Sequence, residues 1–246
     1  MPHRTLGIEE VAQYLHLNPV EIERLVKEQD IPFERRGTRV VFRKVDIDAW
    51  ASPRVLSMNG RRLMDYHQKS SGTVRQVSHS QAILPAMLRP EFIEPFLAAK
   101  TQASVLREMA ALANRTRGVC DPAALLAGLE AREKLCSTGL PGGLAILHIR
   151  EPEPYIFESM FLVLGRPVQQ IHFGAPDGRP TDLFFLIACP DPSFHLHCLA
   201  RLCIVAQSAE LLDDLRKAPD AAGMYDLLIA AEQAALERAR TAARSS

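Results

Sequence analysis

The segment 61–80 divides the chain into a small front region and a larger rear region. Its sequence, RRLMDYHQKSSGTVRQVSHS, is polar, rich in serine and glutamine, and lacks sustained apolar periodicity. Because such a stretch supplies no continuous apolar face, we expect two domains joined by a linker. The predicted boundaries are a first domain at 1–60, the linker at 61–80, a second domain at 81–236 and a flexible tail at 237–246.

The composition limits how the protein can bind its partners. The 246 residues carry 29 Lys and Arg against 29 Asp and Glu, so nucleic-acid binding needs a local basic patch. No stretch has the roughly 18 apolar residues of a membrane span, and the first residues lack the apolar core of a signal peptide. The five cysteines are irregularly spaced, which is typical of reduced thiols. We therefore expect a cytoplasmic protein with no membrane partner.

The front region predicts a small winged helix-turn-helix fold. Apolar residues recur at helical spacing in IEEVAQYL, and LNPVEIERLVKEQ predicts a second helix with Asn18 as its cap and Pro19 in its first turn. The sequence IPFERRGTRVVFRKVDIDAWA then predicts a strand, a turn at RGT, a second strand and a helix from about Val45. Two short helices followed by a hairpin form a helix-turn-helix unit with a wing.

Basic residues cluster on this predicted wing and on the second helix. The stretch 35–44 contains no acid, and clustered cations of this kind suit contacts with phosphates. A solvated hairpin on a small protein-interaction domain is the alternative. The predicted DNA-binding residues are Arg24, Lys27, Arg35, Arg36, Arg39, Arg43 and Lys44.

The stretch LGIEEVAQYLHLNPVEIERLVKEQDIPFERRGTRVVFRKVDIDAW resembles the excisionase-like branch of the MerR-type helix-turn-helix family. The two helices, the IP entry, the basic hairpin and the closing DIDAW occur in the family's order. The resemblance implies that DNA is a partner. One such module reads few base pairs, so we expect a homodimer or a second DNA-bound partner.

The rear region predicts an α/β domain. Helical periodicity is present in LREMAALANRT and PAALLAGLEAREKL, whereas GLAILHI, MFLVLG and TDLFFLIACP are short apolar runs typical of buried strands. Asp177 and Gly178 suit a tight turn between two of these strands. The sequences HLHCLARLCIVAQ and SAELLDDLRKA predict further helices.

Three motifs of the rear region are together similar to a known family: AREKLCSTGLPGGLAILH, VQQIHFGAPDGRPTDLFFLIACP and HLHCLARLCIVAQSAELLDDLRKA. They resemble the enzyme IIA domain of the fructose/mannitol class of the sugar phosphotransferase system, including its nitrogen-regulatory branch. The resemblance implies a mixed sheet flanked by helices, and a histidine that accepts a phosphoryl group from an HPr-type phosphocarrier protein. By motif, this histidine is His148, Arg132 is the cation beside the phosphate, and His195 is the supporting histidine.

The chemistry of these residues suits that role. A phosphohistidine site needs a neutral imidazole with an exposed lone pair, and arginine can hold the transferring phosphoryl group through charged hydrogen bonds. We expect Gly139, Gly142 and Gly143 to keep the approach to His148 clear.

Alternatives remain open at the same positions. His148 could be a satisfied side chain at a strand end, and Arg132 could pair on a helix surface. Leu147 stands where the family usually has proline, and Ile149 places bulk where a partner would dock. A binding module that is not phosphorylated is therefore one alternative, and a phosphocarrier whose front domain binds another protein is a second.

We predict no metal, no cofactor and no turnover of small molecules beyond phosphoryl transfer. The spacing of Cys189, His195, His197, Cys198 and Cys203 matches no usual zinc pattern, and a P-loop is absent from the sequence. A helix-turn-helix joined to an enzyme IIA-like domain indicates regulation. The leading hypothesis is a DNA-binding regulator that senses phosphotransferase status, either by phosphorylation of His148 or by docking of a partner.

Overall fold

A computed structural model describes residues 5–58, 60–73, 81–149 and 156–244. Its contacts divide the chain into two compact units. The first comprises Met1–His79 and Pro192–Arg201, and the second comprises Ser80–Asp191 and Leu202–Ser246. Helix α8 (Pro192–Ala206) therefore begins in the first unit and ends in the second. Within the described ranges, no helix is long and apolar enough to cross a membrane.

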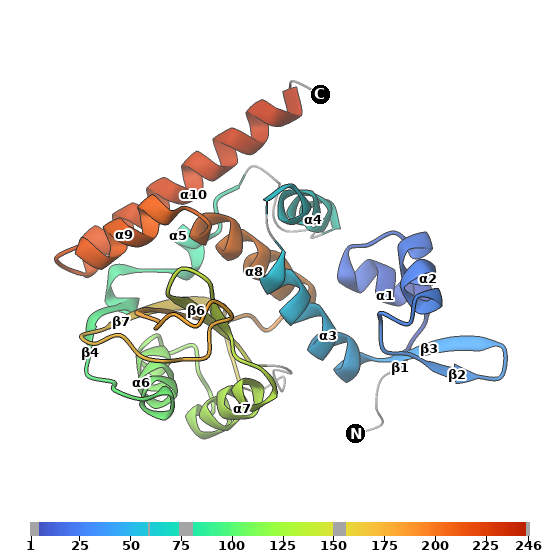
Figure 1. Cartoon of the computed structure of the whole chain (residues 1–246), viewed down its shortest axis with the longest axis horizontal. Coiled ribbons are helices and arrows are strands. Elements are labelled where there is room, and N and C mark those ends of the chain that lie inside the picture. Colours follow the sequence, from blue (N-terminus) through green and yellow to red (C-terminus); the bar gives the residue numbers. More distant parts are fainter. Residues whose placement is uncertain (1–4, 59, 74–80, 150–155, 245–246) are drawn as a thin grey trace. The chain divides into compact units, whose positions relative to one another are not determined.

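The first unit contains the predicted helix-turn-helix and wing. Its sheet pairs β3 with β1 and β2, both antiparallel, and the β2–β3 hairpin extends from the helices of this unit (Figure 1). The Asn18 side chain caps α2 by accepting a hydrogen bond from the Val20 amide at 3.0 Å, as predicted. The elements are β1 (Thr5–Leu6), α1 (Ile8–Leu15), α2 (Pro19–Lys27), β2 (Glu34–Arg36), β3 (Arg39–Arg43), α3 (Lys44–Ser57) and α4 (Gly60–Thr73).

The core of the first unit follows the predicted apolar periodicity. Val11 and Leu15 of α1, Ile22 and Leu25 of α2, and Phe42 of β3 are all buried. Full burial of such a side chain contributes about 1.5–3 kcal/mol. The two short helices are therefore held by their shared apolar faces and by the hairpin.

Helix α4 occupies most of the segment 61–80 predicted as a linker, in which the sequence analysis found no sustained apolar periodicity. The helix extends to Thr73, and residues 74–80 lie outside the described part of the chain. Its buried face consists of Leu63, Tyr66, His67 and Ser70, at the i, i+3, i+4, i+7 spacing of an amphipathic helix. Two of these four residues are polar, so a search for apolar periodicity misses the helix.

Residues of α8 that belong to the first unit bind the His67 and Ser70 side chains of α4. Arg201 Nε donates to His67 Nε2 at 2.8 Å, and the Ser70 hydroxyl lies 2.8 Å from His197 Nδ1. The rings of His67 and His197 stack with their centroids 4.4 Å apart. The buried polar face of α4 is thus part of a hydrogen-bonded network, which is the condition for burying such groups.

The second unit is built on a mixed five-stranded sheet with the order β4-β7-β8-β6-β5. Strand β8 is parallel to β6 and antiparallel to β7, β7 is parallel to β4, and β6 is antiparallel to β5. This topology confirms the predicted α/β fold with a mixed sheet. The strands are β4 (Ile93–Leu97), β5 (Gly139–Leu140), β6 (Leu144–Leu147), β7 (Phe161–Pro167) and β8 (Leu183–Ala188).

The three strands predicted from apolar runs are the three central ones. The sequence analysis missed the two edge strands, β4 and β5. Strand β4 contains Pro95, which an edge tolerates because one side of the strand needs no ladder hydrogen bonds. Apolar runs identify strands that are covered on both sides, and an edge strand lacks that signal.

Helices cover both faces of the sheet. Helices α6 and α7 lie on one face, and α9 and α10 lie on the other (Figure 1). Helix α10 continues to Arg244 and thus includes residues 237–244 of the segment predicted as a flexible tail. The run ERARTAAR is rich in strong helix formers, which explains the extension. The remaining elements are α5 (Leu84–Met87), η1 (Pro90–Phe92), α6 (Gln102–Arg115), α7 (Pro122–Leu135), α9 (Ala209–Lys217) and α10 (Ala221–Arg244).

Strand β6 positions His148. Its four residues are buried, and it lies between β8 and β5 in the sheet. The parallel register pairs Leu147 with Leu186. His148 follows at the carboxyl end of a central strand, where open α/β sheets often carry functional side chains.

Candidate functional site

Both ring nitrogens of His148 make hydrogen bonds. Arg132 Nε donates to Nε2 at 3.2 Å, and Nδ1 lies 2.9 Å from the backbone oxygen of Ile146. Because a guanidinium group only donates, Nε2 carries the lone pair and the ring proton is on Nδ1. The imidazole is thus held as the neutral tautomer with Nε2 as its nucleophilic atom.

The lone pair of His148 is less open than the sequence analysis expects. The side chain is 1% exposed, and Arg132 covers Nε2. The expectation of an exposed imidazole is therefore wrong for this arrangement. A phosphoryl donor can reach Nε2 only if the surrounding residues open and Arg132 moves aside.

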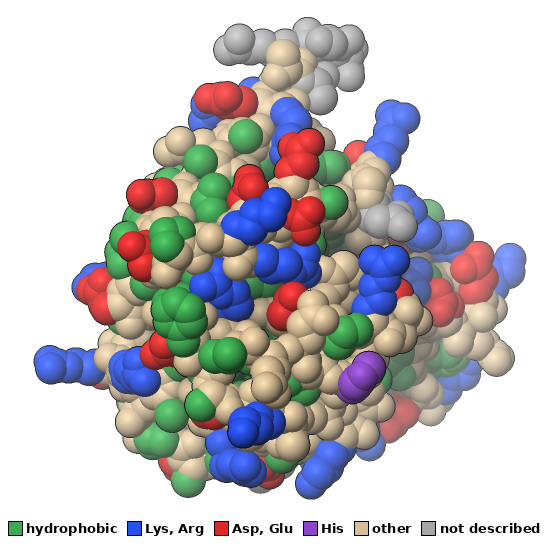
Figure 2. Space-filling view, turned by 60° about the vertical axis from the view of Figure 1, so that its left-hand side comes forward, with side chains coloured by type: hydrophobic (Ala, Val, Ile, Leu, Met, Phe, Trp, Pro, Cys, Tyr) green, Lys and Arg blue, Asp and Glu red, His purple; other side chains and the backbone are tan. Residues whose placement is uncertain are grey.

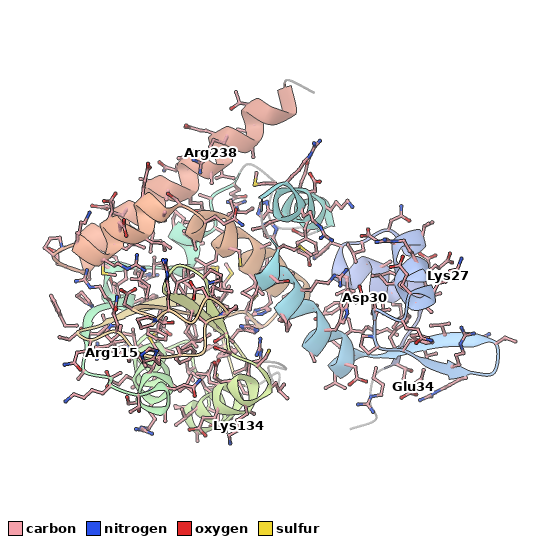
Figure 3. The ribbon with its side chains drawn as sticks, in the orientation of Figure 1. Lys27, Asp30, Glu34, Arg115, Lys134 and Arg238 are labelled. Atoms are coloured by element: carbon pink, nitrogen blue, oxygen red, sulfur yellow. The ribbon has the colours of Figure 1, made fainter. Side chains whose placement is uncertain are left out.

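Arg132 lies at the end of α7 and is buried, so it does not pair on the helix surface as the alternative suggested. Its Nη1 donates to the backbone oxygen of Cys136 at 2.9 Å. Its Nη2 is buried and has no hydrogen-bond partner among the described residues. A buried unpaired donor costs about 1–3 kcal/mol, which an oxyanion beside His148 Nε2 would recover. Lys134, on the same helix, is by contrast exposed (Figure 3).

Glu133 holds the loop that precedes β6. Its carboxylate accepts hydrogen bonds from the Thr138 amide at 3.1 Å and from the Thr138 hydroxyl at 2.6 Å. The backbone oxygen of Thr138 in turn accepts from the Ile146 amide at 3.2 Å. Of these two neighbouring residues of α7, Arg132 thus binds His148, and Glu133 binds the loop that leads into β6. The sequence analysis did not single out Glu133, although it directly follows Arg132 in the motif AREKLCSTGLPGGLAILH.

The backbone angles and close contacts of the loop before β6 account for its glycines. Gly142 and Gly143 have positive φ angles of 94° and 84°, which favour glycine. Arg216 Nη2 donates to the Gly142 oxygen at 2.5 Å, and a Cβ at Gly143 would lie 2.7 Å from that nitrogen. Asp177 accepts from the Gly142 amide at 3.1 Å, and this bond lowers the pKa of Asp177. Gly139 packs closely too, because a Cβ there would lie 3.1 Å from Ala175.

The departures from the family pattern beside His148 are buried. Leu147 and Ile149 belong to the apolar core of the second unit. A Cβ at Gly128 of α7 would lie 2.9 Å from Ile149 Cγ2, so the isoleucine fills the space over that glycine. The expectation that Ile149 adds bulk at a docking surface is therefore wrong.

His195 belongs to the first unit by its contacts, at the start of α8. Burial and the nearby charge of Lys44 lower the pKa of His195 to about 4, so it is uncharged at neutral pH. Its role as a supporting group for His148 stays a prediction. Across the described ranges, no three His, Cys, Asp or Glu side chains converge as a metal-binding group.

Most of the predicted DNA-binding residues are exposed on the first unit, with Lys27 at its outer edge (Figure 3). Arg36 lies 3.3 Å from Glu34, and Arg24 lies 3.6 Å from Glu28. Exposed pairs of this kind contribute at most about 1 kcal/mol, so both arginines can exchange their partners for phosphates. The exposed residues are Arg24, Lys27, Arg35, Arg36 and Arg39.

Arg43 and Lys44 have partners within the fold. Arg43 Nε lies 2.9 Å from Asp46, and Lys44 Nζ lies 2.7 Å from the buried Asp48. Lys44 also lies 5.0 Å from the centre of the Tyr14 ring, at cation–π distance. These contacts give both cations a structural role, and their binding to DNA stays a prediction.

Charges of both signs are mixed elsewhere on the surface. Figure 2 shows one face on which basic and acidic side chains are interspersed with apolar ones, without a field of a single sign. This distribution agrees with the formal net charge of zero. The hairpin stretch 35–44 stands out because it contains no acid at all.

Known families match both parts of the chain. The model of the phosphoenolpyruvate-dependent sugar phosphotransferase system, EIIA 2, matches residues 86–231, and that of a helix-turn-helix domain matches residues 5–54. The fold and these matches define a regulatory protein that carries an EIIA-type domain behind a helix-turn-helix. The chain belongs to the EIIA 2 family of the phosphotransferase system.

Two relatives of the EIIA part are nitrogen regulatory proteins. The protein from Bradyrhizobium diazoefficiens is 33% identical over 144 residues, which cover 58% of this chain and 92% of the relative. The protein from Pseudomonas aeruginosa is 35% identical over 127 residues, which cover 51% of this chain and 80% of the relative. Both resemblances inferred from the sequence are thus confirmed at the level of domain family.

Solved structures share the fold of the second unit. The nitrogen regulatory protein IIA-Ntr from Neisseria meningitidis has a TM-score of 0.54 at 24% identity, covering 60% of this chain and 99% of its own. The mannitol IIA protein from Escherichia coli has a TM-score of 0.52 at 19% identity, covering 57% of this chain and 98% of its own. At these identities the likeness concerns the fold alone.

Proposed function

We propose that the protein is a DNA-binding regulator whose EIIA domain takes a phosphoryl group from an HPr-type carrier onto His148 Nε2. The observation that carries this proposal is the pairing of His148 with Arg132. The ring proton is on Nδ1, Nε2 faces a guanidinium, and Nη2 of that guanidinium has no hydrogen-bond partner in the described ranges. The nitrogen regulatory relatives support the regulatory part of the proposal.

The transfer needs no proton movement at His148. The Nε2 lone pair attacks the phosphorus of the carrier's phosphohistidine, and the donor N–P bond breaks with its electron pair returning to the donor nitrogen. Nδ1 keeps its hydrogen and donates to the Ile146 oxygen throughout. Arg132 leaves Nε2 and donates through Nε and Nη2 to the phosphoryl oxygens, where charge must be stabilised.

The phosphoryl group acts on DNA binding indirectly. It adds roughly one and a half to two negative charges. Two unit charges about 20 Å apart in water have an interaction energy of roughly 0.2 kcal/mol. Salt weakens this interaction further, because the Debye length is about 8 Å. Direct repulsion of DNA is therefore too weak, and the signal must act through partner docking or association of two chains.

Helix α8 supplies a covalent connection for such a signal. It follows β8, the strand that pairs with β6 next to His148. Its Leu196 belongs to the apolar core of the first unit. A change at the carboxyl end of β6 can thus be transmitted along one continuous segment to the unit that carries the hairpin.

The test is phosphorylation of the full chain by phosphoenolpyruvate, enzyme I and an HPr-type carrier, followed by intact mass measurement. We expect one acid-labile phosphate, absent from His148→Ala and retained by His172→Ala, because His172 is exposed. DNA binding is then compared with and without phosphate. Absence of phosphate with several competent donors, in a folded protein, would contradict the proposal.

A binding module that is never phosphorylated is the second candidate. It is favoured by the burial of His148 and by the hydrogen bonds at both of its nitrogens. In that case the carrier binds with equal affinity to the native chain and to His148→Gln, and neither gains phosphate.

A further inference from the structure

Cys136 carries an exposed thiol that is in contact with Arg132. The residue directly follows α7, and its Sγ lies 3.5 Å from Arg132 Nη1, which also donates to the backbone oxygen of Cys136 at 2.9 Å. Cys120 is the second exposed cysteine, and no cation of the described residues contacts its thiol. The two exposed thiols thus differ in their electrostatic surroundings.

The guanidinium of Arg132 has a donor that the fold does not use. Arg132 is 4% exposed, its Nε is bound to His148, and its Nη2 has no hydrogen-bond partner among the described residues. No carboxylate in the described ranges pairs with Arg132, and the adjacent Glu133 is bound to Thr138. The positive charge beside Cys136 is therefore not neutralised, and one buried donor remains available to an anion.

Such surroundings suit oxidation of a thiol by hydrogen peroxide. The thiolate is the reactive form, and oxidation-sensitive cysteines lie at exposed, electropositive positions. The sulfur electron pair attacks one peroxide oxygen, the O–O bond breaks, and the departing hydroxide takes the thiol proton and leaves as water. Sulfur loses two electrons and peroxide gains them. The sulfenic acid that forms carries one new oxygen, which is a hydrogen-bond acceptor in its anionic form.

We propose that Cys136 is a modification site for peroxide, and that Arg132 holds its sulfenate oxygen. The new oxygen is bonded to the sulfur that already lies 3.5 Å from Nη1, so it accepts hydrogen bonds from the Nη groups. These bonds fix the guanidinium where it covers His148 Nε2, and Nη2 is no longer available to a phosphoryl group. Oxidation therefore slows phosphorylation of His148, a consequence that rests on the proposed function.

The first experiment treats the full chain with hydrogen peroxide, traps sulfenic acid with dimedone and measures each labelled cysteine peptide by mass. Cys136 should be labelled about tenfold faster than Cys120, which is also exposed but lacks the guanidinium. In urea, which separates Arg132 from Cys136, the two cysteines should be labelled at similar rates. Labelling of Cys136 no faster than that of Cys120 in the folded chain overturns the proposal, as does a difference that persists in urea.

Arg132→Gln and Lys134→Gln form a matched pair on α7, because Lys134 is exposed and makes no contact with the thiol (Figure 3). Only Arg132→Gln should slow the labelling of Cys136, to about the rate of Cys120. An unchanged rate at Cys120 shows that the variants are folded. Equally fast labelling of Cys136 in the native chain and in folded Arg132→Gln overturns the role of the arginine.

The second experiment measures the consequence for His148. After removal of peroxide, the oxidised chain should gain phosphate from an HPr-type carrier at least about tenfold more slowly than the reduced chain. Dithiothreitol should restore the rate. Cys136→Ser should lose this sensitivity to peroxide, and Cys120→Ser should keep it. An equal response of the two variants overturns the coupling.

The two proposals fail in different ways. If the reduced chain gains no phosphate, the proposed function is wrong, and the labelling rates of Cys136 still decide the modification site because they need no carrier. The ring signals of His148 in NMR spectra then report the coupling. Oxidation of Cys136 should shift them and leave those of the exposed His172 unchanged. Unchanged His148 signals in a chain oxidised at Cys136 would overturn the coupling.

Discussion

The two units place their arginines in opposite environments. In the hairpin of the first unit, Arg35, Arg36 and Arg39 are exposed and bound at most by a surface pair. In the second unit, Arg132 is buried beside His148, and Arg166 donates to backbone oxygens. The first group is available to an external anion, and the second is largely committed to the fold.

The comparison shows that the neighbouring sequence of an arginine indicates whether its side chain is exposed to solvent or bound within the fold. The positive charge alone does not distinguish the two cases. The hairpin arginines flank a tight turn, and all three residues of β2 are exposed although successive side chains point to opposite faces. Arg166 follows the apolar run of β7, and Arg132 lies in the last turn of α7, where it is buried beside His148. A guanidinium removed from water at such positions must find carbonyl or imidazole partners. The predictions below use this contrast.

The largest expected effect is on stability, for Arg166→Ala. Nη1 donates to three backbone oxygens at the end of α9 at 2.7, 2.8 and 2.8 Å, and Nε donates to the Pro95 oxygen at 3.1 Å. Losing these bonds should lower the free energy of unfolding by about 3 kcal/mol, as measured in urea. Arg39→Ala should change it by less than about 0.5 kcal/mol. Equal losses of stability in the two variants would contradict the contrast between the arginines of the two units.

Arg132→Lys should show whether Arg132 takes part in phosphoryl transfer or only stabilises the fold. Lysine keeps the charge but cannot offer two nitrogens of one planar group to the phosphoryl oxygens, so the phosphorylation rate should fall about 100-fold. Lys134→Ala, at an exposed position of the same helix, should leave the rate unchanged. The measurement is intact mass against time with an HPr-type carrier. An unchanged phosphorylation rate in Arg132→Lys would mean that Arg132 has only a structural role.

Acidification should test whether burial and the nearby charge of Lys44 keep His195 neutral in the folded protein. Burial and Lys44 lower the pKa of His195 from 6.5 to about 4, so between these pH values the unfolded chain binds more protons. The contribution of neutral His195 is complete above pH 6.5 and is lost as the pH falls toward 4. The free energy of unfolding should drop by about 1–2 kcal/mol from pH 7 to pH 5.

The controls for acidification are two histidine variants. His195→Gln should flatten the pH dependence, and His172→Gln should keep it, because His172 is exposed. If both variants retain the full slope, another group causes the loss, and Lys44 does not act on His195 as described.

Arg39→Ala should weaken DNA binding about threefold to tenfold, whatever the DNA sequence. It should also reduce the slope of the logarithm of the binding constant against the logarithm of the salt concentration by about 1. Arg43→Ala should have a smaller effect, since Arg43 is bound to Asp46. The measurement is fluorescence anisotropy with labelled duplexes at several salt concentrations. A larger loss for Arg43→Ala would mean that exposure does not decide which hairpin cations contact phosphate.

The sequence was sufficient to predict the parts of the fold whose signals are local. Helices α1 and α2 have an apolar period and a cap, and β6, β7 and β8 are continuous apolar runs. Helix α4 was missed because His67 and Ser70 occupy its buried face, and their partners His197 and Arg201 lie more than 100 positions away in the chain. Polar burial of this kind depends on distant residues and leaves no periodic signal.

The proximity of His148 and Arg132 could be predicted from the sequence, but their burial and hydrogen bonds could not. Family motifs identify His148 and Arg132, and the structure brings them together at 3.2 Å. Motifs do not report that Arg132 covers Nε2 or that Ile149 turns into the core over Gly128. Both facts depend on how α7 packs beside β6, a tertiary relation that spacing along the chain does not encode.

The smallest expected effect is that of Asn18→Ala, which sharpens the comparison because it changes stability without changing charge. Removing the cap of α2 should cost about 1 kcal/mol of the stability of the first unit, as measured by its thermal unfolding. DNA affinity at a temperature where the unit stays folded should be unchanged, the reverse of the result for Arg39→Ala. If Asn18→Ala weakens DNA binding as much as Arg39→Ala does, the hairpin arginines act through folding and not through contact with phosphates.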